Sequence, residues 1–543
     1  MRFSKLAALA ALSVATAALP GIASAQQSLA KYVRDGKRDI VLAAITSPDV
    51  DVDQPEPDGS TALHWAVYKV DHELVRALLD AGATANVTTR YGSTPLTEAV
   101  KLGDLELVRM LLDAGADPDS PNLDNQTALM LAASIGSLEI AKLLIERGAD
   151  VNAIERFRNQ NALMWAAGED HPDIVDLLLA NGATDLDRRA AHDDWPRQMT
   201  SEPRAQFRAT GGLTALLFAT RSGCYRCVVS LIEAGADIDR PNPDGITPLI
   251  NAIDNRHFDI AMYLIDQGAK VDVWDMYGRT PIYMAVDMNS FRGGGGFGGG
   301  GGFGGPPRPP RESNVTALDV VRRLLAMGVD VNHELTRMRP NGPGRGRFAD
   351  YMMRGGTGPL MVATLAHDHE AIELLLAHGA EVDLPNVFQI TPLMAAAGMS
   401  GTVRAGGGRT GQGPEFEATV IKTIDLLLDA GANINAQVFD SHTNTAKQDS
   451  YIPGADNEGK TALHAAAEMG WARVVKHLLD RGADPTIQDA YGNTALDLAM
   501  RRRGGGPGPG GFGGRGAGAG GNAPAGPSVV DVLREAMQSA RAD

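Results

Sequence analysis

Residues 58–64 read DGSTALH and residues 91–96 read YGSTPL, so one short motif occurs twice in close succession. A third copy begins at Asp124, and the step from Tyr91 to Asp124 equals the step from Asp58 to Tyr91. Later copies begin near Arg158, Gly211, Asp244, Tyr277, Gly355, Phe388, Glu458 and Tyr491. Where the step between copies is longer, an insertion accounts for the excess. A fixed period of this kind is the signature of a repeat protein, in which neighbouring copies stack to bury a shared core.

Each copy has the same internal order of residues. It opens with Thr-Ala-Leu or Thr-Pro-Leu, where the threonine suits a helix N-cap and proline is tolerated in the first turn. A short alanine-rich helix follows, and then a second helix with leucines at helical spacing. A glycine next suits the left-handed position that ends a helix, and a turn-forming stretch leads to the next copy. These glycines are Gly82, Gly115, Gly148, Gly182, Gly235, Gly268, Gly328, Gly379, Gly431 and Gly482.

The motif resembles the ankyrin repeat. Thr61–His64 and Thr461–His464 read TALH, close to the family's Thr-Pro-Leu-His, and Gly148–Asn152 reads GADVN, like the end of the family's repeat. About eleven units in register cover most of residues 28–543. The resemblance implies an all-α ankyrin-repeat solenoid of stacked helix-turn-helix units, with projecting β-hairpin loops and flexible Gly/Pro-rich insertions. It also implies that His64 and His464 are structural and bond adjacent hairpins.

Shifts in composition predict how the chain is organised. Terminal repeats lack one neighbour and need a polar outer face, as the last helix within residues 528–543 provides, and the irregular helix-turn-helix pattern of residues 28–57 indicates a cap at the other end. Gly- and Pro-rich insertions cannot bury enough apolar surface to fold and are expected to be flexible. The predicted segments are a signal peptide at 1–25, a capping repeat at 28–57, repeats at 58–291 with a hairpin insertion at 187–210, a Gly/Pro-rich insertion at 292–311, repeats at 312–500 with insertions at 333–354, 401–414 and 436–456, a Gly-rich insertion at 501–527, and a C-terminal capping helix at 528–543.

The start of the chain, residues 1–25, has the pattern of a secretory signal peptide. Arg2 and Lys5 give a positive start, Leu6–Leu19 is apolar, and Ala23-Ser24-Ala25 supplies the small residues of a cleavage site. We expect cleavage after Ala25 and a location in the periplasm or outside the cell. The resemblance then indicates a bacterial-type exported ankyrin-repeat protein.

Charge and motif content restrict the classes of function. The net charge of −16 argues against nucleic acid as the partner, because phosphate binding needs a basic surface. No later apolar run is long enough to predict a membrane span in the mature chain. We find no nucleophile elbow, phosphate-binding loop or histidine pair of zinc-protease spacing, and therefore expect no catalytic residues, cofactor or metal.

The expected function is a monomeric, non-catalytic scaffold that binds a protein partner. Two alternatives stay open. Basic Gly/Arg-rich loops would suit a structural protein bound to a cell-envelope polymer, and an enzyme site built by the insertions is the less favoured possibility.

Cys224 and Cys227 form a C-x-x-C pair, a spacing that also occurs in redox proteins. Counting back from Gly235, Cys224 takes the helix-start position that Asp104 has in its repeat, and Cys227 takes the apolar position of Leu107. Buried cysteines are common in such apolar stripes. We therefore expect two buried thiols or a structural disulfide rather than a redox centre.

The resemblance places partner contacts at the hairpin tips and just before the turn between the two helices of a unit. Aromatic and arginine side chains there are typical of binding hot spots, although a tip tyrosine can instead pack across adjacent hairpins. Trp65, Trp165 and Phe218 fall on framework positions and are expected to pack. The candidate partner-binding residues are Tyr68, Lys69, Arg90, Tyr91, Phe157, Arg158, Met276, Tyr277, Arg279, Phe388 and Tyr491.

Overall fold

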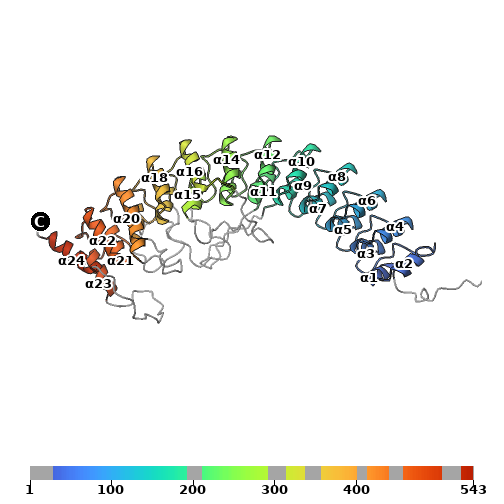
Figure 1. Ribbon diagram of the computed structural model, residues 1–543, viewed down its shortest axis with the longest axis horizontal. Helices are drawn as coiled ribbons and strands as arrows, with labels where there is room; N and C mark the ends of the chain where they lie inside the picture. Colours follow the sequence, from blue (N-terminus) through green and yellow to red (C-terminus); the bar gives the residue numbers. More distant parts are fainter. Residues whose placement is uncertain are drawn as a thin grey trace, which may run out of the picture. The chain divides into compact units, whose positions relative to one another are not determined.

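A computed structural model describes residues 28–192, 211–290, 313–336, 356–399, 413–439, 457–503 and 527–541. The chain divides into two compact units, residues 1–157 and 158–543, which are described separately. The predicted signal peptide and most of each insertion lie outside the described residues. Within each unit the helices follow one another as antiparallel pairs in chain order (Figure 1).

The described residues of unit 1, 28–157, form four helix pairs. The first pair belongs to the predicted capping repeat, and its helices pack on the helices of the next pair, α1 on α3 and α2 on α4. The first helix of each pair is called inner and the second outer. The helices are α1 (Leu29–Arg34), α2 (Arg38–Ala44), α3 (Ala62–Tyr68), α4 (His72–Asp80), α5 (Pro95–Leu102), α6 (Leu105–Asp113), α7 (Ala128–Ile135) and α8 (Leu138–Glu146).

Unit 2 contains the other helix pairs of the described residues. Inner helices pack on inner helices and outer on outer from one pair to the next. The inner helices are α9 (Ala162–Gly168), α11 (Ala215–Ser222), α13 (Pro248–Asp254), α15 (Pro281–Ser290), α17 (Pro359–Leu365), α19 (Pro392–Met394) continued by η2 (Ala395–Met399), α21 (Ala462–Met469) and α23 (Ala495–Arg503). The outer helices are α10 (Pro172–Ala180), α12 (Tyr225–Glu233), α14 (Phe258–Asp266), α16 (Ala317–Ala326), α18 (His369–Ala377), α20 (Pro414–Asp429), α22 (Ala472–Asp480) and α24 (Val529–Ser539).

The repeated residues form these helices for local reasons. The opening threonine is the N-cap of most inner helices, and the Thr94 side chain accepts a hydrogen bond from the Thr97 N–H at 3.1 Å. The glycines predicted to end the outer helices all have a positive φ, from 76° at Gly328 to 97° at Gly482. Small residues such as Ala132 and Ala133 are fully buried and allow inner helices to approach closely. The predicted helical repeat is therefore confirmed.

In five of the described connections between repeats, a buried or half-buried Asp or Asn in the turn binds backbone N–H groups. Asp275 accepts hydrogen bonds from the N–H groups of Tyr277 and Arg279, at 2.9 and 3.0 Å. This residue stands five positions before the opening threonine, a regularity that the sequence analysis missed. The other members are Asn122, Asn242, Asn386 and Asp489.

The described part of the chain departs from the expectation in three ways. It contains one isolated β-bridge, between His192 and Gly211, and no strand, so the loops are hairpin-like turns. The inner helix that starts at Pro392 changes to a π-helical turn at Ala395. Helix α20 begins at Pro414, where an insertion was expected to end, and extends over 16 residues. No described helix has the length and apolar character required to cross a bilayer.

Candidate functional site

The hairpin tips of unit 1 carry side chains on a backbone that the neighbouring repeat holds. The Arg90 N–H donates to the Asp58 carbonyl at 2.8 Å, and the Arg156 N–H donates to the Asp124 carbonyl at 3.2 Å. The adjacent Tyr91 and Phe157 side chains are 75% and 74% exposed. Arg90 is exposed as well. The tips thus present aromatic side chains to solvent from fixed positions.

A second exposed group lies at the end of the inner helix α3. Tyr68 is 62% exposed and Lys69, the C-cap, is also exposed. The Tyr68 ring packs edge-on against Trp65, with 5.8 Å between ring centroids. Trp65 is half-buried, and its Nε1–H lies within 3.2 Å of both the Glu56 carboxylate and the Ser60 hydroxyl. Tyr68 therefore stands against an anchored indole, which limits the side-chain entropy it would lose on binding.

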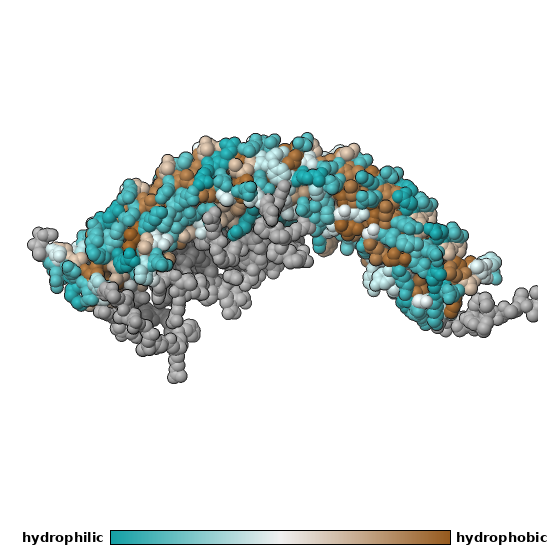
Figure 2. All heavy atoms as spheres, in the orientation of Figure 1, coloured by the Kyte–Doolittle hydropathy of each residue, from teal (hydrophilic) through white to brown (hydrophobic). Residues whose placement is uncertain are grey.

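The tips of unit 2 are less uniform. Tyr491 is 65% exposed and Arg158 is exposed, whereas Met276 and Phe388 are half-buried. Trp165 is half-buried and Phe218 is buried, as the framework interpretation expects. Apolar residues appear among hydrophilic ones on the visible surface of both units (Figure 2). The aromatic residues predicted to bind a partner are thus most exposed in unit 1 and at Tyr491.

Tyr277 and Arg279 are buried, so neither is exposed on the surface that the sequence predicted for partner binding. The Arg279 Nε donates to the Asp275 carboxylate at 2.6 Å, and a second carboxylate, Asp254, lies 3.8 Å from the Arg279 guanidinium. Burial opposes this charge, but Asp254 and Asp275 outweigh it and raise the pKa of Arg279. The guanidinium lies over the Tyr277 ring, 5.5 Å from its centroid. These two residues stabilise the turn instead of projecting from it.

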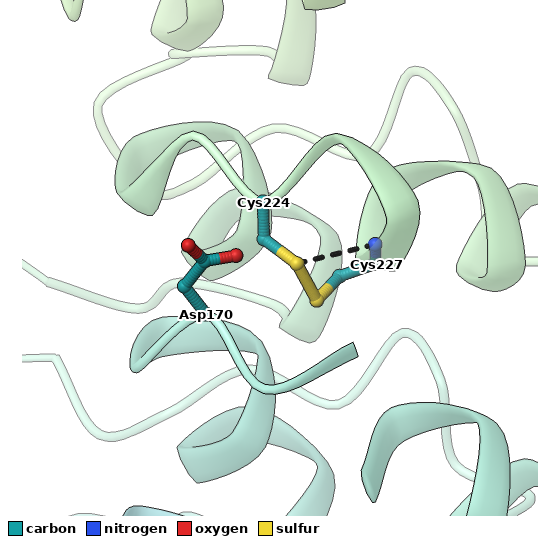
Figure 3. Close-up of side chains that lie close together, drawn as sticks. All are labelled: Asp170, Cys224 and Cys227. Atoms are coloured by element: carbon teal, nitrogen blue, oxygen red, sulfur yellow. Dashed lines mark hydrogen bonds between the residues drawn. A yellow bond between two sulfur atoms is a disulfide. The ribbon is translucent and has the colours of Figure 1, made fainter. Parts of the chain in front are cut away.

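The cysteine pair lies at the start of α12. A disulfide joins Cys224 to Cys227, and both residues are buried. The Cys227 N–H donates to the Cys224 sulfur at 3.2 Å, so Cys224 is the N-cap. Asp170, in the turn between α9 and α10, lies beside them (Figure 3). Among the described residues, these three side chains are the one cluster in which several potential metal ligands meet.

His64 and His464 have structural roles, as the resemblance implied. In each case Nδ1 is within 3.2 Å of the N–H of the opening threonine, and Nε2 is 3.2 Å from a carbonyl of the next repeat. Burial lowers the pKa of both imidazoles. A neutral ring with its proton on Nε2 satisfies both contacts, which leaves neither histidine available for acid–base chemistry.

Comparisons with known proteins match this fold. A family model described as ankyrin repeats in three copies matches residues 29–122, 115–190 and 216–292, and a second, described as ankyrin repeats in many copies, matches residues 453–499. Together they cover more than half of the chain.

Several curated proteins are similar over part of the chain. The Neurogenic locus Notch protein of Drosophila melanogaster is 36% identical over 121 residues, 22% of this chain and 4% of that protein. The B-cell lymphoma 3 protein homolog of Mus musculus is 29% identical over 148 residues, 27% of this chain and 25% of that protein. A protein named Probable E3 ubiquitin-protein ligase XBOS34, from Oryza sativa subsp. japonica, is 30% identical over 133 residues, 24% of this chain and 19% of that protein.

The chain spans a quarter or less of the length of these three relatives, so the similarity concerns the repeats. The helix pairs, the fixed period of the sequence and the family matches agree with one another. This chain belongs to the ankyrin-repeat family.

Proposed function

We propose that this chain is a non-catalytic scaffold that binds a protein partner in the periplasm or outside the cell. Ankyrin-repeat proteins are in general interaction scaffolds, and the matched relatives are consistent with that role. His64 and His464, which lie in the TALH motifs, bond to the next repeat and have structural roles. A protein partner is therefore the ligand class that the chain suits best.

Two features support export. Residues 1–25 have the charge, apolar run and small-residue site of a signal peptide. The disulfide between Cys224 and Cys227 suits an oxidising compartment, where such bonds persist. Cell fractionation of the full-length chain tests this point, since export predicts a shortened protein that begins at Gln26 in the periplasm or the medium.

The exposed aromatic residues of unit 1 are the observation that carries the proposal. Tyr68, Tyr91 and Phe157 each expose more than half of their surface, although aromatic residues usually bury most of it. Tyr91 and Phe157 adjoin backbone that the preceding repeat holds, and Tyr68 leans on Trp65. Rigid aromatic anchors of this kind supply binding energy at low entropic cost.

Affinity capture with a matched pair of variants tests the site. The mature chain, the triple variant Tyr68→Ala/Tyr91→Ala/Phe157→Ala and the control Ile40→Ala are each used to capture partners from the envelope fraction. Ile40 is an exposed apolar residue of α2, an outer helix, and does not belong to a hairpin tip. We expect the triple variant to lose capture about tenfold or more while the control retains it.

Circular dichroism should show the same helical content in all three proteins. Equal capture by the triple variant would exclude the assigned surface. Absence of any enriched protein with the wild-type chain would contradict the scaffold function itself.

A further inference from the structure

We propose that Asp170, Cys224 and Cys227 form a redox-gated binding site for Zn²⁺, closed in the disulfide form and open in the dithiol form. The proposal is independent of the partner-binding surface. One carboxylate oxygen of Asp170 and the two cysteine sulfurs all lie within 4.8 Å of one another. The carboxylate of Asp170 lies next to the first turn of α12, which carries both sulfurs (Figure 3).

The position of Cys224 holds a carboxylate in three other repeats, whereas Ser137, His171, His257 and Trp471 take it in others. The equivalent N-cap of α4 is Asp71, whose carboxylate accepts a hydrogen bond from the Leu74 N–H at 3.0 Å. Asp104 accepts from Leu107 in α6 at 2.9 Å in the same way. In α12 the Cys224 sulfur takes this role, with the Cys227 N–H at 3.2 Å. Because helix N-termini stabilise negative charge, a Cys224 thiolate fits the slot that carboxylates occupy elsewhere.

Asp170 adds a second negative group where the fold does not require one. Its φ is +64°, and the corresponding turn position is occupied by Gly103, Gly136 and Gly223 in three other repeats and by Val70, Arg256 and His367 in three more, all with positive φ. The position thus accepts residues of several types, and in this repeat it carries a carboxylate beside the two sulfurs. With Cys224 and Cys227 as thiolates, three anionic ligand atoms would meet within a few ångströms. A bound cation would neutralise the repulsion between them.

The types of ligand select the metal. Thiolate sulfur prefers Zn²⁺ among the abundant divalent ions, and a carboxylate oxygen completes many zinc sites. The Cα atoms of the two cysteines are 5.2 Å apart, so both side chains reach one point from a single helical turn. Asp170 is exposed whereas both cysteines are buried, so the ion would reach the sulfurs from the side of Asp170. Three protein ligands leave the fourth position to water.

Opening the site requires two electrons and two protons from a dithiol reductant. Thiolate attack breaks the Cys224–Cys227 bond, and the reductant leaves as its own disulfide. Each cysteine sulfur then carries one proton as a thiol. Binding of Zn²⁺ releases these two protons to solvent, and the Asp170 carboxylate supplies the third ligand.

The test uses the full mature chain in oxidised form and after reduction with a dithiol that is then removed without oxygen. Co²⁺ serves as the spectroscopic probe, and Zn²⁺ affinity is measured by competition with a chromophoric chelator. We expect one Co²⁺ per reduced chain with thiolate-to-cobalt charge-transfer absorption, and loss of that absorption in the oxidised chain and in Cys224→Ser/Cys227→Ser. Zn²⁺ should displace the Co²⁺.

Two carboxylate variants provide the matched comparison. Asp170→Asn should weaken Zn²⁺ binding by about tenfold or more, because even groups outside the ligand shell change affinity by about 10–100-fold. Asp173 lies in the first turn of α10, is exposed and pairs with Arg226. Asp173→Asn should therefore leave the Zn²⁺ affinity unchanged. The proposal is overturned if the reduced chain shows no charge-transfer band, if the two variants bind alike, or if reduction abolishes the helical circular dichroism signal.

Discussion

The Nε2 atom of His64 lies 3.2 Å from the carbonyl oxygen of Ser93, a residue of the next repeat. The other ring nitrogen lies 3.0 Å from the Thr61 hydroxyl at the N-cap of α3. One imidazole therefore connects the start of an inner helix to the hairpin of the following repeat. Repeat proteins are stabilised by such nearest-neighbour contacts, because distant repeats do not touch.

Replacing His64 by alanine should loosen this connection. We expect the free energy of local opening around residues 89–94 to fall by about 1–3 kcal/mol, because the buried Thr61 and the Ser93 carbonyl lose a partner. Hydrogen exchange followed by mass spectrometry measures this directly and avoids assuming two-state unfolding in a long array. The control is His378→Ala, whose exposed ring bonds the Leu374 carbonyl of its own outer helix, at 2.8 Å. Equal protection of residues 89–94 in wild type and His64→Ala would contradict the prediction.

Replacing Arg279 by alanine should destabilise unit 2 without acting on a surface. The Asp275 carboxylate is fully buried and would lose its charged partner, a change that typically costs about 3–5 kcal/mol. We expect a lower urea midpoint and faster exchange in the turn at residues 275–279. The matched control Arg240→Ala removes an exposed arginine of the preceding turn and should change stability by less than about 0.5 kcal/mol. Similar urea midpoints for the two variants would show that the buried Arg279–Asp275 ion pair contributes little to stability.

The sequence was sufficient to predict the parts of the fold that depend on local residues. The threonine caps and the glycines that end the outer helices each follow from a residue repeated at a fixed period, and the roles of His64 and His464 follow from the resemblance to the ankyrin motif. A local rule of this kind applies wherever the motif recurs. The exposed aromatic tips Tyr91 and Tyr491 were also predicted from register, although their contact with a partner stays a prediction.

The sequence was insufficient where a side chain depends on residues from other elements. Tyr277 takes the same tip position as Tyr91, but Arg279 covers its ring because Asp254, at the end of α13, and Asp275 attract the guanidinium. Other repeats have Ser93 or Asn493 at the position of Arg279. A charged residue at a position that is usually an uncharged polar one was therefore the sequence feature that could have indicated the ion pair. Phe416 lies in the extended first part of α20 and packs against His367 and Trp471 from two other repeats, contacts that the local sequence does not reveal.

Two glycines of unit 1 allow a matched test of how closely hairpins approach. Gly82 and Gly92 both have a positive φ, of 92° and 69°. A Cβ atom on Gly82 would meet no atom within 4 Å, whereas one on Gly92 would clash with the backbone nitrogen of Leu123. We expect Gly82→Ala to cost only the left-handed strain of about 1–2 kcal/mol. Gly92→Ala should cost clearly more and speed exchange at residues 122–126, and equal costs would mean that the hairpins can separate freely.

A half-buried histidine, His367, makes stability depend on pH near α17 and α18. His367 donates to or accepts from the Thr423 hydroxyl at 3.0 Å, and Phe416 packs edge-on against its ring. His369 also bonds Thr423, at 3.1 Å. Burial, with a smaller contribution from the charge of His369, lowers the pKa of His367 to about 4.

The folded chain therefore favours neutral His367, and protonation favours unfolding. Neutral His367 contributes its full stabilisation above the unfolded pKa of about 6.5. This stabilisation decreases as the pH falls toward 4 and is lost below that pH, a total loss of about 3 kcal/mol. His367→Asn removes the titrating group, and asparagine tolerates the φ of 54° at this position. Exchange rates of residues 359–377 measured between about pH 7 and about pH 4.5, corrected for the intrinsic effect of pH, should show a smaller loss of protection in the variant. Parallel pH profiles for the two proteins would exclude His367 as the source.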